Sequence, residues 1–361
     1  MKKLIYYGFL YIALITFLGG CTKNQDDTST GGTTTTVAQD KQAITDVMRS
    51  IAQCAGNINS GGFATSFYNF FALVNGTSYA DNWVQSMTDQ LSAMRDFNQI
   101  GTINRFDLTY FSGHYSWNQG TSSFTYSPMN GEIIIDFPSS QSNGSNDCTF
   151  QVSQYTDGAY IINNETFFLP QSVVATLHKS NHLIMSLNFN AQYATSGFPV
   201  PLSLTTDVFL EPFHYVTTIS RNTSTQFHFQ TSIQDGSACE TSLDASVSFA
   251  NADFENFVLE EDLNNIVFTA KKGTLEVSGS WDARSYYSFT SPSVAETNST
   301  LNVGVFSQGQ RIGDLRIYDN FFSSDDLYIY YKDGSSENTS IYNDPLISDL
   351  KSILEPYFGP L

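Results

Sequence analysis

The stretch Ser242-Leu243-Asp244-Ala245-Ser246-Val247-Ser248-Phe249 places an apolar residue at every second position, with small polar or acidic residues between. Successive side chains of a β-strand point to opposite faces of the sheet, so this alternation is typical of a strand with one buried face. Residues 183–190, 226–233 and 275–282 repeat the pattern. These segments predict a body built mainly of half-buried strands.

Short turn signals separate the predicted strands. They end in glycine, and they lie at Asn118-Gln119-Gly120, Lys271-Lys272-Gly273, Gln308-Gly309 and Asp333-Gly334. Connections this short join antiparallel neighbours, and their spacing over residues 99–343 predicts about sixteen to eighteen strands. No motif recurs at a fixed period, which argues against a propeller or a solenoid.

Helical periodicity is found on both sides of this β body. Over residues 37–55 the apolar positions follow the spacing i, i+3, i+4, i+7 and i+8, at Ile44, Val47, Met48, Ile51 and Ala52. The same spacing over residues 63–74 and 80–94 predicts two more helices within the segment 38–98. A fourth helix is expected over 344–361, capped by Asp344, with Pro345 at its first position, and packed on the body.

The expected fold class is therefore α+β, mainly antiparallel β. Sixteen strands about 4.8 Å apart would span roughly 75 Å, whereas four helices about 10 Å wide would cover about 40 Å. Because the helices are too few to cover the sheet, we expect a large curved sheet, half-barrel or sandwich-like, with three N-terminal helices and one C-terminal helix.

The composition excludes two classes of protein. The chain has 361 residues, of which 41% are hydrophobic, so it can bury a core and is not disordered throughout. Lys and Arg number 16 against 35 Asp and Glu, which gives a net charge of −19. A charge of this sign repels phosphate backbones, so nucleic acid is excluded as a partner.

The amino terminus carries a targeting signal. Lys2 and Lys3 precede an apolar run over residues 4–18 that is shorter than the roughly twenty residues of a membrane-spanning helix. The run ends in Leu18-Gly19-Gly20-Cys21, which resembles the lipobox of bacterial lipoproteins. The resemblance implies that residues 1–20 are a signal peptide and that Cys21 becomes the acylated first residue. The alternative is an uncleaved signal anchor.

A polar segment over residues 21–37 follows Cys21 and is expected to be a disordered tether. Together with the lipobox, the predicted helices and the strand meander, it makes the chain look like uncharacterised cell-envelope lipoproteins of Bacteroidota. That resemblance implies an outer-membrane lipoprotein, held by acyl chains on Cys21, on the periplasmic or the cell-surface side. It implies no catalytic residues.

Three cysteines remain once Cys21 is acylated, in an oxidising compartment. Cys54 lies near the apolar stripe of the first helix and is expected to be a buried thiol. Cys148 and Cys239 both open predicted strands, so one possible disulfide joins these two residues.

Two histidines form the candidate metal site. His178 and His182 flank Lys179-Ser180-Asn181, and a three-residue hairpin would place their side chains opposite each other. A transition metal needs a third ligand, and none lies nearby in the sequence. The alternative is that both are solvent-facing residues at the tip of a hairpin, with no metal bound.

Four aromatic residues are the candidate ligand-binding residues: Tyr115, Trp117, Tyr328 and Tyr330. Aromatic faces stack on the apolar faces of sugar rings. Tyr328 and Tyr330 alternate with Leu327 and Ile329, so the tyrosines are exposed if the aliphatic residues are buried. The alternative is cross-strand aromatic pairing that stabilises the sheet.

No nucleophile elbow, metalloprotease pair, phosphate loop or dinucleotide fingerprint is present. Carboxylates cluster at Glu260-Glu261-Asp262 and at Asp325-Asp326, and a glycosidase would need two of them facing each other across a cleft. We therefore expect a non-catalytic module, without a cofactor, that binds a hydrophobic ligand, a glycan or an envelope partner. The alternatives are a carboxylate-based hydrolase and a purely structural surface protein.

Overall fold

The computed structural model describes residues 35–57, 60–74, 105–162, 165–235, 239–318 and 326–358. The chain divides into two compact units. Met1–Asn57 and Ser220–Leu361 form one, here called the terminal unit, and Ile58–Ile219 forms the other, the central unit. The signal peptide, Cys21 and the tether expected before residue 35 lie outside the described residues, as does the helix expected over 80–94.

The central unit is an antiparallel sheet with one parallel pair. Its strand order is β7-β6-β5-β4-β3-β1-β2, and the parallel pair is β1 with β3. Its elements are α3 (Phe63–Val74), α5 (Leu108–Phe111), β1 (Gly113–Asn118), β2 (Ser123–Ser127), β3 (Ile133–Phe137), β4 (Cys148–Ile162), β5 (Glu165–Lys179), β6 (His182–Tyr193) and β7 (Pro201–Leu210). Phe70 of α3 packs on Phe137 and Phe150, so this helix covers the core of the unit.

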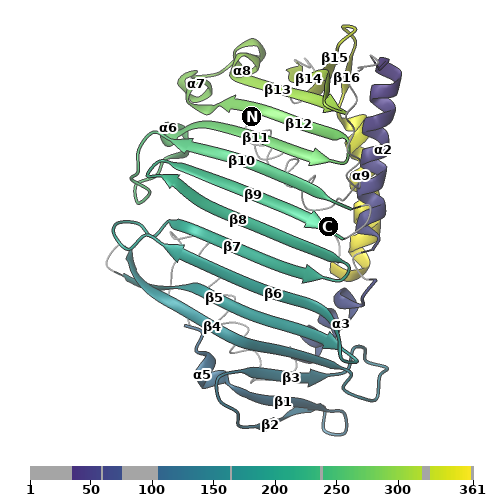
Figure 1. Ribbon diagram of the computed structural model, residues 1–361, viewed down its shortest axis with the longest axis vertical. Helices are drawn as coiled ribbons and strands as arrows, with labels where there is room; N and C mark the ends of the chain where they lie inside the picture. The colour runs from purple at the N-terminus through teal and green to yellow at the C-terminus, as the bar shows by residue number, and fades with distance from the viewer. Residues whose placement is uncertain are drawn as a thin grey trace. The chain divides into compact units, whose positions relative to one another are not determined.

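The terminal unit is an antiparallel meander in which strands β9 to β16 lie in chain order (Figure 1). Its strands are β9 (Gln226–Gln234), β10 (Thr241–Phe249), β11 (Leu263–Lys272), β12 (Leu275–Asp282), β13 (Leu301–Ser307), β14 (Gln310–Tyr318), β15 (Asp326–Tyr331) and β16 (Ser336–Asn338). Its helices are α2 (Val37–Ala55), α6 (Leu259–Asp262), α7 (Ala283–Ser288), α8 (Val294–Thr300) and α9 (Ser340–Phe358). Strand β8 (Phe213–Thr223) crosses the boundary between the units.

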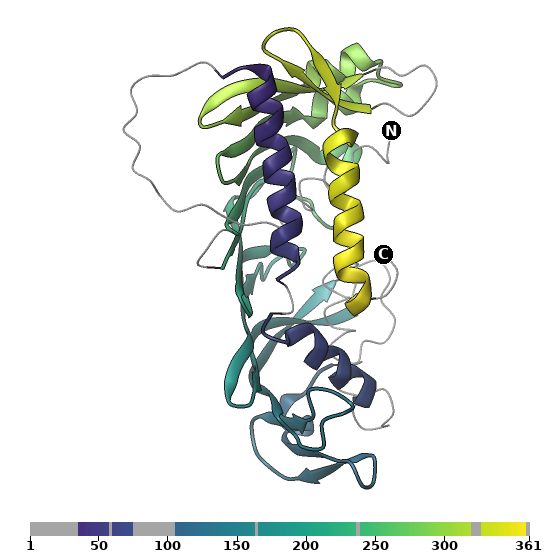
Figure 2. The ribbon, with the colours of Figure 1, turned by 90° about the vertical axis from the view of Figure 1, so that its right-hand side faces the viewer.

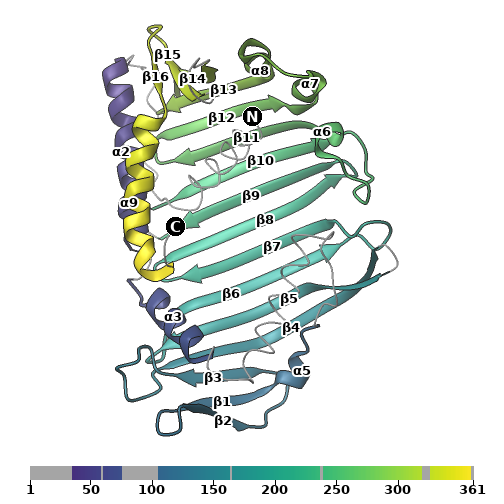
Figure 3. The ribbon, with the colours of Figure 1, turned by 180° about the vertical axis from the view of Figure 1, so that it is seen from behind.

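Helices α2 and α9 lie side by side at one end of the strands of the terminal unit (Figures 2 and 3). Thr36 begins α2 with a capping box, in which its hydroxyl accepts from Gln39 N and its own N–H donates to Gln39 Oε1. The predicted stripe of α2 is buried at Ile44 and Ile51, and the latter packs with Leu346 and Leu350 of α9. Thus α9 packs against α2, not only against the sheet.

The expected fold class is confirmed at this level, because the strands are mainly antiparallel and sixteen of them lie within the described residues. The helices expected over 37–55 and 63–74 are confirmed. Helix α9 begins at Ser340, four residues before its expected start, because Asn338 Oδ1 and Thr339 O accept its first N–H groups. None of the helices in the described ranges is long and apolar enough to cross a bilayer.

Candidate functional site

The two candidate aromatics of the central unit belong to its core. Tyr115 is 6% exposed, and its hydroxyl donates to Phe111 O at 2.8 Å. Trp117 has the same parity on β1 and packs edge-on against Phe124, with ring centroids 5.1 Å apart. These two rings do not form an exposed ligand platform, because this face of β1 is covered.

Tyr328 and Tyr330 are half-buried, on the solvent-facing side of β15 rather than in its core. Between them, Ile329 is buried on the opposite face, where α2 packs. The register of the antiparallel pair sets Tyr328 opposite Arg316 and Tyr330 opposite Asp314 of β14. Cross-strand partners share one face of a sheet, so the structure brings two tyrosines, a guanidinium and a carboxylate together.

Further aromatic and charged side chains extend this group over β13–β15. The Tyr318 and Tyr328 ring centroids are 4.8 Å apart, and the guanidinium carbon of Arg316 lies 5.6 Å from the Tyr330 ring centroid. The guanidinium of Arg311 lies 5.8 Å from the ring of Phe306. We call this group the aromatic–arginine platform, and it consists of Phe306, Arg311, Asp314, Arg316, Tyr318, Tyr328 and Tyr330.

Asp314 holds both guanidiniums of the platform. Its Oδ1 accepts from Arg311 Nε at 2.8 Å and lies 2.5 Å from Arg311 Nη2, while its Oδ2 lies 3.5 Å from Arg316 Nη2. Both arginines are exposed, so they keep donors that face solvent. One carboxylate thus orients two planar donor groups beside aromatic rings.

Gly304 makes room for one side of the platform. A Cβ atom at this position would lie 2.7 Å from the Phe306 ring and 3.2 Å from the guanidinium carbon of Arg311. Only a residue without a side chain lets that ring and that guanidinium lie over the strand.

On the covered face, a buried polar network joins β15 and β16 to α2 and α9. The Tyr331 and Tyr342 hydroxyls are 2.8 Å apart, and Tyr342 donates to Glu337 Oε2 at 2.7 Å. Burial raises the pKa of Tyr331 to about 12, and burial with these hydrogen bonds raises the pKa of Tyr342 well above its ordinary value. Lys41 of α2 lies 3.2 Å from the same carboxylate oxygen of Glu337. Both phenols are therefore neutral at ordinary pH and hold the elements together.

An ion pair between a buried carboxylate and a partly exposed lysine lies close to this network. Asp40 of α2 is 1% exposed, and its Oδ2 lies 3.0 Å from Lys332 Nζ. The same ammonium donates to the Thr35 hydroxyl, which in turn donates to the other oxygen of Asp40 at 2.6 Å. The start of α2 is thus fixed to the turn between β15 and β16.

Two of the candidate carboxylates accept hydrogen bonds from groups close to them in the fold. Glu260 and Glu261 are exposed, whereas Asp262 is buried and accepts from Val258 N at 2.8 Å and Asn251 Nδ2 at 2.5 Å. Asp326 accepts from Asn338 at 3.0 Å, and Asp325 lies outside the described residues. Asp262 and Asp326 therefore each have a structural role.

The expected pairing of His178 with His182 is wrong. The turn has two residues, Ser180 and Asn181, both with positive φ, so Lys179 faces His182 and His178 faces Leu183. The two imidazoles lie on opposite faces, and His182 instead contacts Glu211 Oε1 at 2.9 Å. Among the residues that the structure describes, no group of three His, Cys, Asp or Glu side chains is arranged to hold a metal ion.

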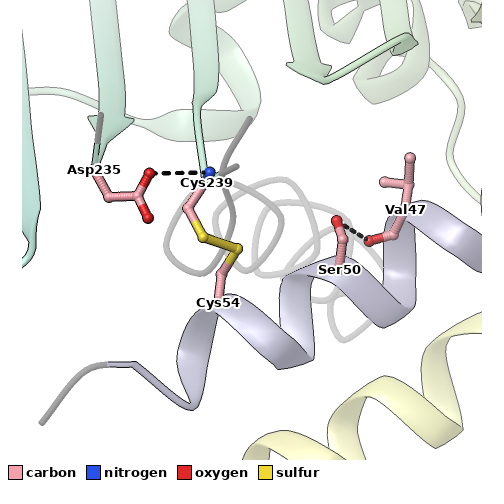
Figure 4. The surroundings of a disulfide bond; sticks show 5 residues. All are labelled: Val47, Ser50, Cys54, Asp235 and Cys239. Carbon is pink, nitrogen blue, oxygen red and sulfur yellow. Dashed lines mark hydrogen bonds between the residues drawn. A yellow bond between two sulfur atoms is a disulfide. The ribbon is translucent and has the colours of Figure 1, made fainter. Parts of the chain in front are cut away.

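The expectation that Cys54 is a free buried thiol is wrong, and the possible disulfide between Cys148 and Cys239 is not formed. Cys54, in the last turn of α2, forms a disulfide with Cys239, which lies just before β10 in the same unit (Figure 4). Cys148 is a buried thiol of the central unit, and burial raises its pKa to about 11. Spacing along the chain did not reveal that the end of α2 lies beside the start of β10.

Sequence reasoning missed the platform residues of β13 and β14. The signal was present in β14, where Asp314, Arg316 and Tyr318 alternate with small or apolar residues. Arg311 joins the same face because the register shifts by one residue at Val305/Phe306, and no alternation predicts that shift.

Comparisons with known proteins found no matching family model, no matching curated protein and no matching solved structure.

Proposed function

We propose that the chain is a lipid-anchored envelope module, without catalytic activity, that binds a glycan on the aromatic–arginine platform. The observation that carries the proposal is the placement of two exposed guanidiniums beside the exposed ring of Tyr318 and the half-buried rings of Tyr328 and Tyr330, on one face of β14 and β15. Ring faces carry partial negative charge and attract the polarised C–H groups of a sugar ring. The oriented guanidiniums supply donors for its hydroxyl or carboxylate oxygens.

The same chemistry favours a glycan over a wholly hydrophobic ligand. A lipid chain laid on the platform would remove Arg311, Asp314 and Arg316 from water without replacing their hydrogen bonds, which is costly. A saccharide offers oxygen atoms to these groups and C–H faces to the rings. The proposed ligand is therefore an oligosaccharide of the cell's surroundings or of its envelope.

The location is part of the proposal. Anchoring rests on the lipobox-like Leu18-Gly19-Gly20-Cys21, and two or more acyl chains hold a protein stably at a membrane. The Cys54–Cys239 disulfide supports an oxidising compartment outside the cytoplasm. We propose that this anchor holds the protein at the outer membrane.

Binding can be tested by titrating the full chain with defined neutral and acidic oligosaccharides in a calorimeter. We expect Tyr328→Ala/Tyr330→Ala and Arg316→Ala each to weaken the binding of a recognised saccharide about tenfold or more, which corresponds to about 1.4 kcal/mol. Tyr110→Ala removes an exposed tyrosine of the central unit and should leave affinity unchanged. If no saccharide binds, or if the platform variants bind as well as Tyr110→Ala, the proposal is wrong.

Anchoring is tested separately by labelling cells with radioactive palmitate. The wild-type chain should incorporate label and fractionate with membranes, whereas Cys21→Ala should do neither. Equal labelling of the two chains, or no labelling of either, would contradict the anchor.

A further inference from the structure

The segment that leads from β10 into the first residue of α6 exposes three consecutive apolar side chains. Phe257, Val258 and Leu259 are 39%, 44% and 44% exposed, and we call them the apolar tip. Single exposed apolar residues are common on protein surfaces, but a contiguous group is typical of an interaction site. The tip lies at the end of the strands opposite to α2 and α9 (Figures 1 and 3).

The backbone of this segment is held in place by hydrogen bonds, several of them to the buried residue Asp262. The Asp262 carboxylate, 7% exposed, accepts from Val258 N and from Asn251 Nδ2, while Ala250 N donates to Asp262 O at 2.7 Å. Asp253 accepts from the side chain of Asn256 at 2.9 Å. The tip is therefore presented in a fixed conformation, which lowers the entropy cost of binding.

The base of the tip is an aromatic cluster. Phe249 of β10 packs edge-on against Phe254 and Phe257, with ring centroids 5.5 Å and 5.6 Å apart. Phe227 of β9 joins them, and Arg221 lies 5.5 Å from the Phe254 ring centroid. The exposed tip is thus backed by packed rings that connect it to the sheet of the terminal unit.

The charges around the tip indicate what covers it. Asp253, Glu255, Glu260 and Glu261 are exposed, and residues 250–262 include no lysine or arginine; Arg221 of β8 contributes one positive charge beside Phe254, so negative charge predominates. Four carboxylates beside an apolar group disfavour an anionic lipid surface. They favour an apolar patch bordered by lysine and arginine, because complementary charge steers association and selects partners.

We propose that the apolar tip docks onto a partner protein through an apolar patch bordered by basic side chains. Phe257, Val258 and Leu259 provide the buried centre of the interface, and the surrounding carboxylates provide its charged rim. This site is separate from the aromatic–arginine platform, and it does not depend on the proposed glycan binding.

The probe for this proposal is an eighteen-residue helical peptide with leucines on one face and lysines on the flanks. The full chain is placed in nanodiscs of zwitterionic phosphatidylcholine, and fluorescence anisotropy of the labelled peptide is measured against empty nanodiscs. We expect Val258→Ser/Leu259→Ser to weaken binding at least tenfold. Glu260→Gln/Glu261→Gln should weaken it about threefold at low salt, and less at high salt where charges are screened.

Two matched variants control for general surface effects. Ile341→Ser removes an exposed apolar residue of α9, and Asp344→Asn/Asp349→Asn removes two exposed charges of the same helix. Both should leave peptide binding within twofold of wild type. A peptide with glutamate in place of lysine should bind at least tenfold more weakly.

Three results would overturn the proposal. One is peptide binding that the tip variant does not weaken more than Ile341→Ser does. The second is self-association of the wild-type chain that Val258→Ser/Leu259→Ser abolishes in sedimentation, which would make a second copy the occupant. The third is a blue shift of a bimane label on Val258→Cys when phosphatidylethanolamine and phosphatidylglycerol vesicles are added, which would make lipid the occupant.

Discussion

Tyr330 and Tyr331 are neighbours in β15, but their side chains lie in opposite surroundings. Tyr331 is buried under α2, where its hydroxyl contacts that of Tyr342. Burial raises the pKa of Tyr331, because the phenolate would lose its contact with water. Tyr330 lies on the open face beneath the guanidinium of Arg316. One face of these strands therefore contributes to stability, whereas the other is available for binding. The expected effects of substitution separate the two faces.

The largest expected loss of stability comes from removing the disulfide in the last turn of α2, on the covered side of the sheet. Cys54 and Cys239 are 185 residues apart, and the chain-entropy estimate for such a loop is about 5 kcal/mol. We expect Cys54→Ala/Cys239→Ala to lower the free energy of unfolding by about 3–5 kcal/mol in urea titrations. Reductant should destabilise the wild-type chain and leave the double variant unchanged; equal sensitivity of both would contradict this assignment.

A smaller loss is expected from the ion pair at the start of α2. Lys332→Met leaves the Asp40 carboxylate buried without its cation, and loss of one partner of a buried pair costs about 3 kcal/mol. Because Lys332 itself is partly exposed, we expect about 2 kcal/mol in urea unfolding. Arg49→Met removes one member of the exposed Arg49–Asp46 pair and should cost less than about 1 kcal/mol. A similar cost for both variants would show that burial of Asp40 does not matter.

The smallest effect compares the two neighbouring tyrosines directly. At pH 7 we expect Tyr331→Phe to cost about 1 kcal/mol, because the buried hydrogen bond to Tyr342 is lost, and Tyr330→Phe to cost less than about 0.5 kcal/mol. Urea titrations of both variants would measure the difference. Indistinguishable losses would contradict the contrast between the faces.

The same pair predicts a pH dependence. The pKa of Tyr331 is about 12 in the folded chain and about 10 when unfolded, so the unfolded chain loses this proton first as the pH rises. Its contribution to stability is complete below pH 10 and is lost between about pH 10 and 12. Wild type should therefore lose more stability than Tyr331→Phe over that range in urea titrations, and equal losses would contradict the raised pKa of Tyr331.

Local pattern predicted the strands, their hairpins, the stripe of α2 and the parity of Tyr328 and Tyr330, because these depend on near neighbours in the chain. The alternation of apolar residues gave wrong predictions of burial where the strand pairing shifts by one residue. In β6 a register shift places Ile184 in the core, although alternation assigned burial to Leu183 and Met185. The turn after Lys179 has two residues instead of the three expected, and this change of register places His178 and His182 on opposite faces.

The partners of the platform and the disulfide could not be predicted from pattern alone. Arg316 meets Tyr330 only because β14 pairs with β15 in one particular register. Cys54 meets Cys239 because α2 packs across the strands of its unit, and that contact is made between segments far apart in the sequence. Tertiary packing decided both.

The attachment of α2 at both ends sets a path for mechanical load. A pull on the chain ahead of Thr35 reaches the β15–β16 turn through Lys332, so the first bonds to yield are the polar contacts of Thr35 and Asp40. If these fail, the helix can unwind only as far as Cys54, where a covalent link to Cys239 takes up the tension. We expect the residues of α2 ahead of Cys54 to extend under this load while strands β10 to β16 stay folded.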